Sequence, residues 1–196
     1  MYLYLVRHGQ SEGNAKRLFF GHTDYPLTAL GREQARQAAK KLSSVSFSRC
    51  VTSDLMRAWE TAQICVGARA LRPEKNAALR EQFMGALEGC DWAQSRALYG
   101  DMIDAFVHNW YDTVPPTVEP PASMEARVAA CVDDVLACGE DTLLVAHNGS
   151  LSLVLKRLDL MGPDTLMQPE HAFRHGCYSA VRIEESGKAV LEGFNL

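Results

Sequence analysis

Two short apolar runs, far apart in the chain, both stop at a histidine. The first is LYLVRHG, which reaches His8, and the second is LLVAHNG, which reaches His147. Each run has the length and the apolar character of a strand that is buried on both faces. Because buried strands that alternate with helices favour a parallel sheet, we expect both histidines at the same edge of one sheet.

Strand and helix patterns alternate along the chain between and beyond these runs. We predict a helix in PLTALGREQARQAAKKL with Thr28 as its N-cap, a strand in FSRCVTS, and a helix in DLMRAWETAQICV with Asp54 in its first turn. Helical pieces are predicted in 93–113, a helix from about Ser123, and another in LSLVLKRL. The segment CYSAVRIEESGKAVLEGFN indicates two strands around a Ser186-Gly187 turn. This order predicts an α/β layered domain with a mostly parallel sheet.

The chain has 196 residues, which suits one domain with a sizeable core. We therefore predict a single domain over 1–196. The proline-dense stretch TVPPTVEPP interrupts the alternation of strands and helices. Since little chain follows it, we expect it to bound a small helical and loop insertion, at about residues 82–122, over the functional site.

Charge and composition exclude several classes of partner. The chain carries 20 basic and 24 acidic side chains, with a formal net charge of −4. This balance offers no basic face for nucleic acid or anionic lipid, so an anionic substrate must meet locally placed arginines. No apolar stretch is long enough for a signal peptide or a membrane span, and we expect a cytoplasmic protein. The six cysteines form no C-x-x-C or Cys/His cluster, which predicts reduced thiols and no metal site.

Candidate residues for chemistry gather at the predicted strand ends. Glycines follow both histidines closely and let the backbone approach a ligand. Arg7 precedes His8, and Arg57 lies in the first turn of a helix, where a guanidinium suits a phosphate bidentately. A lone histidine at a strand end is more often structural, and a lone arginine is more often paired on the surface. Here two predicted strands both end in a histidine that a glycine follows closely. This repeated pattern favours a functional role for His8 and His147 in one site.

The segment LREQFMGALEG adds two carboxyl groups, Glu81 and Glu88, in a partly apolar setting. Such a carboxyl group can act as a general acid near neutral pH, although a solvated loop charge is the plain alternative. Two histidines, two arginines and a carboxyl without metal-ligand spacing suit phosphoryl transfer. Imidazole can attack phosphorus to form a phosphohistidine, and arginines stabilise the transferring group.

These segments resemble, in order, the motifs of the histidine phosphatase superfamily, also called phosphoglycerate mutase-like. RHGQSEGN is similar to the family's Arg-His-Gly motif with its downstream Asn, SDLMRAWETA to its second arginine motif, LREQFMGALEG to its acidic segment, and VAHNGS to its second histidine motif. The resemblance implies a three-layer sandwich with a mostly parallel sheet, and a metal-independent enzyme with no cofactor.

The resemblance also implies a role for each residue. His8 would be the nucleophile, and Glu81 would protonate the leaving oxygen and later activate water. Glu88 would belong to a Glu-Gly turn. The phosphoryl group would be held by Arg7, Asn14, Arg57 and His147.

Four departures from the family pattern stand out. Leu87 lies where many members carry tryptophan. Leu18 lies where many mutases carry arginine, and HNG replaces the frequent His-Gly-Gly at Asn148. Ala122-Ser123 replaces a Gly-Glu-Ser-like element, which puts in doubt any polar contact from that position.

The segments around Leu18-Phe19 and Trp110 are similar to those of α-ribazole phosphatases, which remove the 5′-phosphate of α-ribazole in cobalamin synthesis. We expect a phosphomonoesterase whose partner is a small-molecule phosphate ester, either α-ribazole 5′-phosphate or a broader set of sugar or nucleotide phosphates. Two alternatives stay open: a cofactor-dependent phosphoglycerate mutase, and a non-catalytic binding module on the same fold. The oligomeric state is also open, with a homodimer as one candidate.

Overall fold

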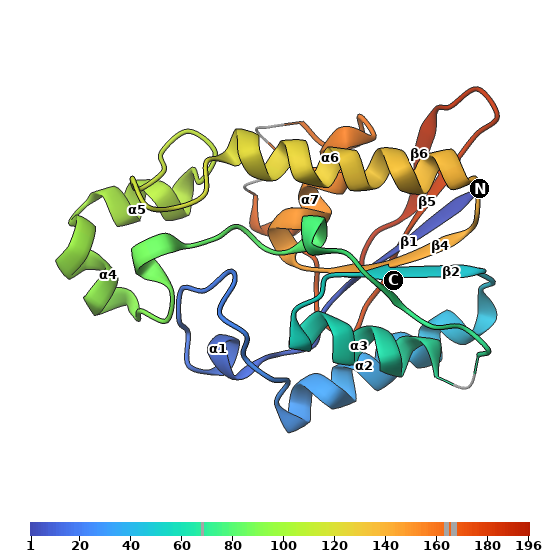
Figure 1. Cartoon of the computed structure of the whole chain (residues 1–196), viewed down its shortest axis with the longest axis horizontal. Helices are drawn as coiled ribbons and strands as arrows, with labels where there is room; N and C mark the ends of the chain where they lie inside the picture. Colours follow the sequence, from blue (N-terminus) through green and yellow to red (C-terminus); the bar gives the residue numbers. More distant parts are fainter. Residues whose placement is uncertain (68, 163–164, 166–167) are drawn as a thin grey trace.

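A six-stranded sheet lies at the centre of the computed structural model, which describes residues 1–67, 69–162, 165 and 168–196 (Figure 1). Its strand order is β3-β2-β4-β1-β5-β6. The strands are β1 (Tyr2–Arg7), β2 (Arg49–Thr52), β3 (Glu74–Lys75), β4 (Thr142–Ala146), β5 (Ser179–Ile183) and β6 (Ala189–Gly193). Strands β3, β2, β4 and β1 pair in parallel, and β5 pairs antiparallel with both β1 and β6. The predicted mostly parallel sheet is confirmed.

Helices cover both faces of this sheet, with α2 and α3 below it and α6 and α7 above it in Figure 1. The helices are α1 (Glu12–Ala15), α2 (Ala29–Lys41), α3 (Met56–Val66), α4 (Trp92–Tyr99), α5 (Met102–His108), α6 (Pro121–Cys138) and α7 (Asn148–Arg157). Short 3-10 turns are η1 (Leu42–Ser44), η2 (Ala77–Leu79), η3 (Gly85–Leu87) and η4 (Pro169–His171). No helix in the described ranges combines the length and apolar character needed to cross a bilayer.

Alternation along the strands divides the buried side chains between two cores. Leu3 and Leu5 of β1 pack with residues of α6 and α7, whereas Tyr4 and Val6 pack with residues of α2 and α3. Successive side chains of a strand point to opposite faces, so a strand buried on both sides must be apolar throughout. This explains the uninterrupted apolar run that opens the chain, and it makes the fold the three-layer sandwich that the family resemblance implied.

Helix boundaries follow local chemistry. Thr28 caps α2 as predicted, because its Oγ1 accepts a hydrogen bond from the backbone N–H of Gly31 at 3.0 Å. The expected place of Asp54 is wrong: Leu55 is the N-cap of α3, and the carboxylate of Asp54 lies before the helix in a salt bridge with Arg80. Helix α6 begins earlier than expected, at Pro121, since proline needs no hydrogen-bond acceptor in a first turn.

Helices α4 and α5 lie beyond one end of the sheet, at the left of Figure 1. They share a separate small core with the preceding turn, formed by Leu87, Ile103, Phe106 and Val118. Leu87, which stands where many members of the family have tryptophan, is fully buried there. The division of 1–196 into one domain with an insertion at about 82–122 stays a prediction.

Candidate active site

The pairing of β1 with β4 brings the two histidines together. Arg7 lies opposite Ala146 in the parallel register, and the backbone N–H of His8 donates to the carbonyl oxygen of Ala146 at 2.9 Å. The rings of His8 and His147 are both buried, with centroids 5.0 Å apart and planes at 61°. The two apolar runs therefore end at one place, as their common design predicted.

One proton of the His8 ring can be placed from its contacts. Nδ1 lies 2.7 Å from the carbonyl oxygen of Gly9, and a carbonyl oxygen only accepts, so Nδ1 carries the proton. Burial, together with the charges of Arg57 and Arg7, holds the pKa of His8 well below its ordinary value. The ring is therefore neutral at pH 7, and its lone pair is on Nε2. A neutral imidazole with a free Nε2 is a competent nucleophile.

Arg7, at the end of β1, presents an unsatisfied donor. Its Nη1 donates to the carbonyl oxygen of Phe173 at 3.0 Å, whereas its Nε is buried without a hydrogen-bond partner among the described residues. Burial lowers the pKa of Arg7, and the charge of Glu81 partly offsets that effect. A buried N–H without a partner is costly, so an anionic ligand that accepts from Nε would stabilise the site.

Arg57, in the first turn of α3, is fully buried. Its Nε donates to Nδ1 of His147 at 3.3 Å, and its Nη1 and Nη2 donate to the carbonyl oxygens of Thr23 and Gly21 at 3.0 and 2.6 Å. Burial lowers the pKa of Arg57 to about 10, so the group is charged at pH 7. A guanidinium has five N–H donors. These bonds occupy three of them, which leaves two for a phosphoryl group.

The loop that accepts from Arg57 is itself anchored by Glu88. One carboxylate oxygen of Glu88 accepts from the backbone N–H groups of Gly21, His22 and Met84, and the other accepts from the N–H and hydroxyl of Thr23. Burial raises the pKa of Glu88, but these hydrogen bonds outweigh it and hold the pKa below its ordinary value. Glu88 is thus a structural anion, consistent with its expected place in the Glu-Gly turn.

His147 is the N-cap of α7 and is enclosed by its neighbours. Since Arg57 donates to its Nδ1, its Nε2 carries the proton and donates to Oγ of Ser53 at 2.9 Å. Burial is the main cause that holds the pKa of His147 well below its ordinary value. Ser53 follows β2, and its backbone N–H donates to the carbonyl oxygen of Val145 in β4, so the ends of these two strands meet at this ring. Its predicted grip on a phosphoryl group stays a prediction.

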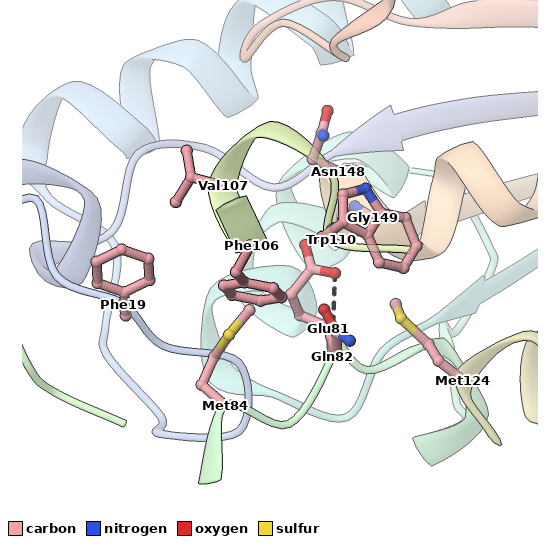
Figure 2. Close-up of a pocket in the computed structure, with 10 residues that line it drawn as sticks. All are labelled: Phe19, Glu81, Gln82, Met84, Phe106, Val107, Trp110, Met124, Asn148 and Gly149. Carbon is pink, nitrogen blue, oxygen red and sulfur yellow. Dashed lines mark hydrogen bonds between the residues drawn. The ribbon is translucent and has the colours of Figure 1, made fainter. Parts of the chain in front are cut away.

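Glu81 reaches the same edge from the segment that crosses above α3. Its carboxylate accepts from the N–H of Gly149, in the first turn of α7, and from the N–H of Gln82, both at 3.1 Å. Figure 2 shows the carboxylate pointing into a pocket of about 240 Å³. The ten lining residues are Phe19, Glu81, Gln82, Met84, Phe106, Val107, Trp110, Met124, Asn148 and Gly149. The carboxylate therefore lies at the first turn of α7, which begins directly after His147, and it lines a largely apolar chamber.

Asn14 and Phe20 have clear structural roles. The amide oxygen of Asn14 accepts from the N–H and the hydroxyl of Ser11 in a capping box at the start of α1. This arrangement leaves the amide N–H₂ of Asn14 as the part that could bind an anion. Phe20 is not among the lining residues of the pocket: Arg57 lies over its ring at 4.9 Å, and Tyr25 packs against it.

Three groups near the histidines were not predicted: Ser53, the carbonyl of Phe173, and His175. Nδ1 of His175 lies 2.5 Å from the backbone oxygen of His8. Ser53 closes the strand pattern FSRCVTS and could have been found as a third strand end. His175 lies in a loop with no periodic pattern, so the sequence carried no comparable signal for it.

Metal ligands are not gathered at this edge. In the described part of the chain, no three His, Cys, Asp or Glu side chains lie close enough together to hold a metal ion. The positive charge of the site comes from Arg7 and Arg57. The arrangement offers a neutral imidazole, two guanidinium groups and a carboxylate, which suits attack on a phosphate ester.

Comparison with known proteins agrees with this chemistry. The profile of the histidine phosphatase superfamily (branch 1) matches residues 3–195. A 2,3-bisphosphoglycerate-dependent phosphoglycerate mutase of Xanthobacter autotrophicus is 36% identical over 180 residues, which are 86% of each chain.

Solved structures extend the likeness to three dimensions. The α-ribazole phosphatase of Shigella flexneri superposes with a TM-score of 0.89 and 30% identity, covering 100% of this chain and 96% of that one. A mycobacterial glucosyl-3-phosphoglycerate phosphatase in complex with VO3 gives a TM-score of 0.86 at 25% identity, covering 99% and 98%. The chain described here belongs to the histidine phosphatase superfamily, branch 1.

Proposed function

We propose that this enzyme hydrolyses a small-molecule phosphate monoester through a phosphohistidine on His8. The observation that carries the proposal is the state of the His8 ring. The carbonyl oxygen of Gly9 accepts a hydrogen bond from Nδ1–H, and burial beside Arg57 and Arg7 keeps the ring neutral, so Nε2 can attack phosphorus. A scaffold protein would gain nothing from a buried nucleophile of this kind, which argues against the non-catalytic alternative.

The reaction proceeds in two displacements. Nε2 of His8 attacks the phosphorus while Glu81 gives a proton to the leaving alcohol oxygen. The free N–H donors of Arg7 and Arg57 stabilise the charge on the three phosphoryl oxygens. We assign a further contact to the amide N–H₂ of Asn14 and another to the Nε2–H of His147, which would exchange its hydrogen bond to Ser53 for one to the phosphoryl group. Glu81, now ionised, takes a proton from water, which attacks the phosphohistidine and releases inorganic phosphate. The positive charges are supplied by arginine, so we propose that no metal is needed.

A phosphatase and a mutase differ in the acceptor of the phosphoryl group, which is water in a phosphatase and a second alcohol in a mutase. Among the ten described lining residues of the pocket, Glu81 is the ionisable one, and the others are mostly apolar or aromatic. The carboxylate of phosphoglycerate would enter this chamber without a cationic partner, at a large desolvation cost. The pocket therefore favours water as the acceptor and an uncharged alcohol as the leaving group. The names of the curated relatives favour the mutase, which we keep as the alternative.

α-Ribazole 5′-phosphate is the substrate we propose first. Its leaving alcohol carries a flat aromatic base, which matches a chamber lined by Phe19, Phe106 and Trp110. The backbone N–H of Phe19 donates to the carbonyl oxygen of Cys90, and its carbonyl oxygen accepts from the N–H of Gly89, so the main chain that carries this ring is held in place. The 30% identity to the α-ribazole phosphatase of Shigella flexneri supports the same choice.

The phosphohistidine can be tested by trapping. Wild type mixed with a ³²P-labelled ester and quenched in base should carry acid-labile, base-stable label. His8→Ala should carry none and should lose turnover, because no other group replaces the nucleophile. His108→Ala is the matched control, since His108 is exposed on α5, and it should keep both properties. Label that persists in His8→Ala would contradict the assignment.

The substrate and acceptor need a second experiment. Release of inorganic phosphate should be measured from α-ribazole 5′-phosphate, fructose bisphosphate, 3-phosphoglycerate and p-nitrophenyl phosphate. We expect the highest kcat/KM on α-ribazole 5′-phosphate and the lowest on 3-phosphoglycerate. Conversion of 3-phosphoglycerate to 2-phosphoglycerate with 2,3-bisphosphoglycerate present, at a rate above that of phosphate release, would establish the mutase instead.

A further inference from the structure

The guanidinium of Arg127, on α6, makes five hydrogen bonds. Three go to backbone carbonyl oxygens in the segment 78–81, and two go to the carboxylate of Glu119. Nη1 donates to the carbonyl oxygens of Ala78 and Arg80, both at 2.7 Å, and Nη2 donates to that of Glu81 at 2.9 Å. Nε and Nη2 also donate to the two carboxylate oxygens of Glu119, both at 2.8 Å. A guanidinium has five N–H groups, so every donor of Arg127 is used.

Glu119 holds the other side of the same segment. Its carboxylate accepts from the N–H of Phe83 at 3.1 Å, and its own N–H donates to the carbonyl oxygen of Phe83 at 2.8 Å. Its carbonyl oxygen accepts from the side-chain amide of Gln82 at 2.7 Å. The ion pair of Arg127 and Glu119 is mostly buried, with 21% and 15% of the side chains exposed. The backbone is therefore fixed both before and after Glu81.

The carboxylate of Glu81, by contrast, has few supports of its own. It accepts from two backbone N–H groups, those of Gln82 and Gly149, each at 3.1 Å. No described side chain donates a hydrogen bond to it. Where its oxygens lie therefore depends on how its own backbone is oriented, and Arg127 binds the carbonyl oxygen of that very residue.

We propose that Arg127, paired with Glu119, is a positioning residue that sets the direction of the Glu81 carboxylate. This pair, which we call the clamp, binds the backbone from 78 to 83. It contacts neither His8 nor the arginines that we assign to the phosphoryl group. This inference goes beyond the proposed function and rests on it in one respect, the assignment of Glu81 as the acid. A loss of the clamp should therefore impair proton transfer to the leaving group and spare the attack by His8.

The leaving group separates these two effects. An activated aryl phosphate such as p-nitrophenyl phosphate needs little protonation, whereas an alkyl phosphate needs much. The rate of phosphoenzyme formation should be measured by single-turnover release of the alcohol. Arg127→Lys keeps the charge but cannot reproduce the fork of five donors. We expect its rate to fall on the order of tenfold for the alkyl ester and less than about twofold for the aryl ester.

A double variant then tests whether Arg127 acts through Glu81. Glu81→Gln alone should show the same leaving-group dependence in a stronger form. Arg127→Lys added to Glu81→Gln should cause no further loss, because residues that act through one another are not additive. Glu119→Gln provides the same test should Arg127→Lys fail to fold, since it retains the shape of the pair and removes its charge.

Arg69 offers a matched control. Its guanidinium also binds backbone carbonyl oxygens, those of Leu42 and Val45, and lies over the ring of Phe47, which belongs to the core shared with α2 and α3. Arg69→Lys should lower thermal stability without any leaving-group dependence. An equal fall for aryl and alkyl esters in Arg127→Lys, or additive losses in the double variant, would overturn the inference. If Glu81→Gln itself lacks the dependence, the acid assignment fails and the inference fails with it.

Discussion

His175 holds the backbone of His8, because its ring Nδ1 lies 2.5 Å from the carbonyl oxygen of that residue. The carbonyl can only accept, so Nδ1 of His175 is protonated and the neutral ring keeps a lone pair on Nε2. Burial, and next the charge of Arg7, lowers the pKa of His175 to about 4. A second proton on this ring would add a buried charge near Arg7, which already disfavours it.

The stability of the fold should therefore depend on pH through His175. In the unfolded chain the pKa of His175 is about 6.5, whereas in the folded protein it is about 4. Between these two pH values the unfolded state binds a proton at His175 and the folded state does not. The free energy of unfolding then decreases as the pH falls from 6.5 toward 4, and His175 accounts for about 1 kcal/mol of the loss at pH 5.5.

Urea unfolding at pH 7.5 and 5.5, in buffer without phosphate, measures this effect. Wild type should lose stability between the two values, since His8 and His147 are also buried in the neutral form. His175→Gln should lose about 1 kcal/mol less over the same interval. An identical loss in both proteins would show that His175 titrates alike in the folded and unfolded states.

The prediction that His8 and His147 lie at one edge of the sheet is confirmed for a physical reason. A strand buried on both faces is apolar throughout, so the point where it ends is visible in one dimension. To place the two strand ends close together, the only further rule needed was that the carboxyl ends of parallel strands lie at the same edge of a sheet. Arg57 was placed by the same reasoning, because a helix begins directly after β2.

Contacts made between distant loops left no such pattern. His175 and the carbonyl of Phe173 reach the site from a segment without periodicity. The ion pair of Glu119 with Arg127 likewise follows no pattern that the sequence shows. Strand β3 has two residues, Glu74 and Lys75, which is too short for any alternation to be read.

Glu88 should control the affinity of the site for anions without touching them. Its carboxylate receives the loop N–H groups of Gly21 and Thr23, whose carbonyl oxygens accept from Arg57. Glu88→Gln would turn an amide N–H₂ toward some of these donors. We expect a loss of about 2 kcal/mol in stability and weaker vanadate inhibition, on the order of tenfold.

Glu60→Gln is the control for that experiment. Glu60 pairs with Arg32 on the surface, where both side chains are about a third exposed or more, so the change should cost less than about 1 kcal/mol and leave vanadate inhibition unaltered. Equal inhibition constants for Glu88→Gln and wild type would show that Arg57 needs no support from the loop.

Activity should not require a divalent metal. The positive charge at the site is provided by Arg7 and Arg57, and His8, the proposed nucleophile, is a neutral imidazole whose tautomer is set by its hydrogen bond to the carbonyl oxygen of Gly9. Turnover of p-nitrophenyl phosphate should be unchanged after exhaustive dialysis against EDTA. A loss that Mg²⁺ or Zn²⁺ restores would contradict this expectation.

Gly149 gives the most direct control over the position of the acid. A Cβ atom at Gly149 would lie 2.3 Å from Oε1 of Glu81, well inside contact distance, and 3.4 Å from the end of Met124. The backbone N–H of Gly149 is also a hydrogen-bond donor to Glu81. The carboxylate is the flexible end of a side chain, so it should move away while the helix stays intact.

Gly149→Ala should therefore impair catalysis more than stability. Alanine is favoured over glycine within a helix by roughly 0.5–1 kcal/mol, which offsets part of any strain, so the melting temperature should change little. Phosphoenzyme formation should slow on the order of tenfold or more for an alkyl phosphate and far less for p-nitrophenyl phosphate, because the first needs the acid and the second does not. Equal slowing for both esters would mean that the methyl group disturbs His147, two residues earlier, rather than Glu81.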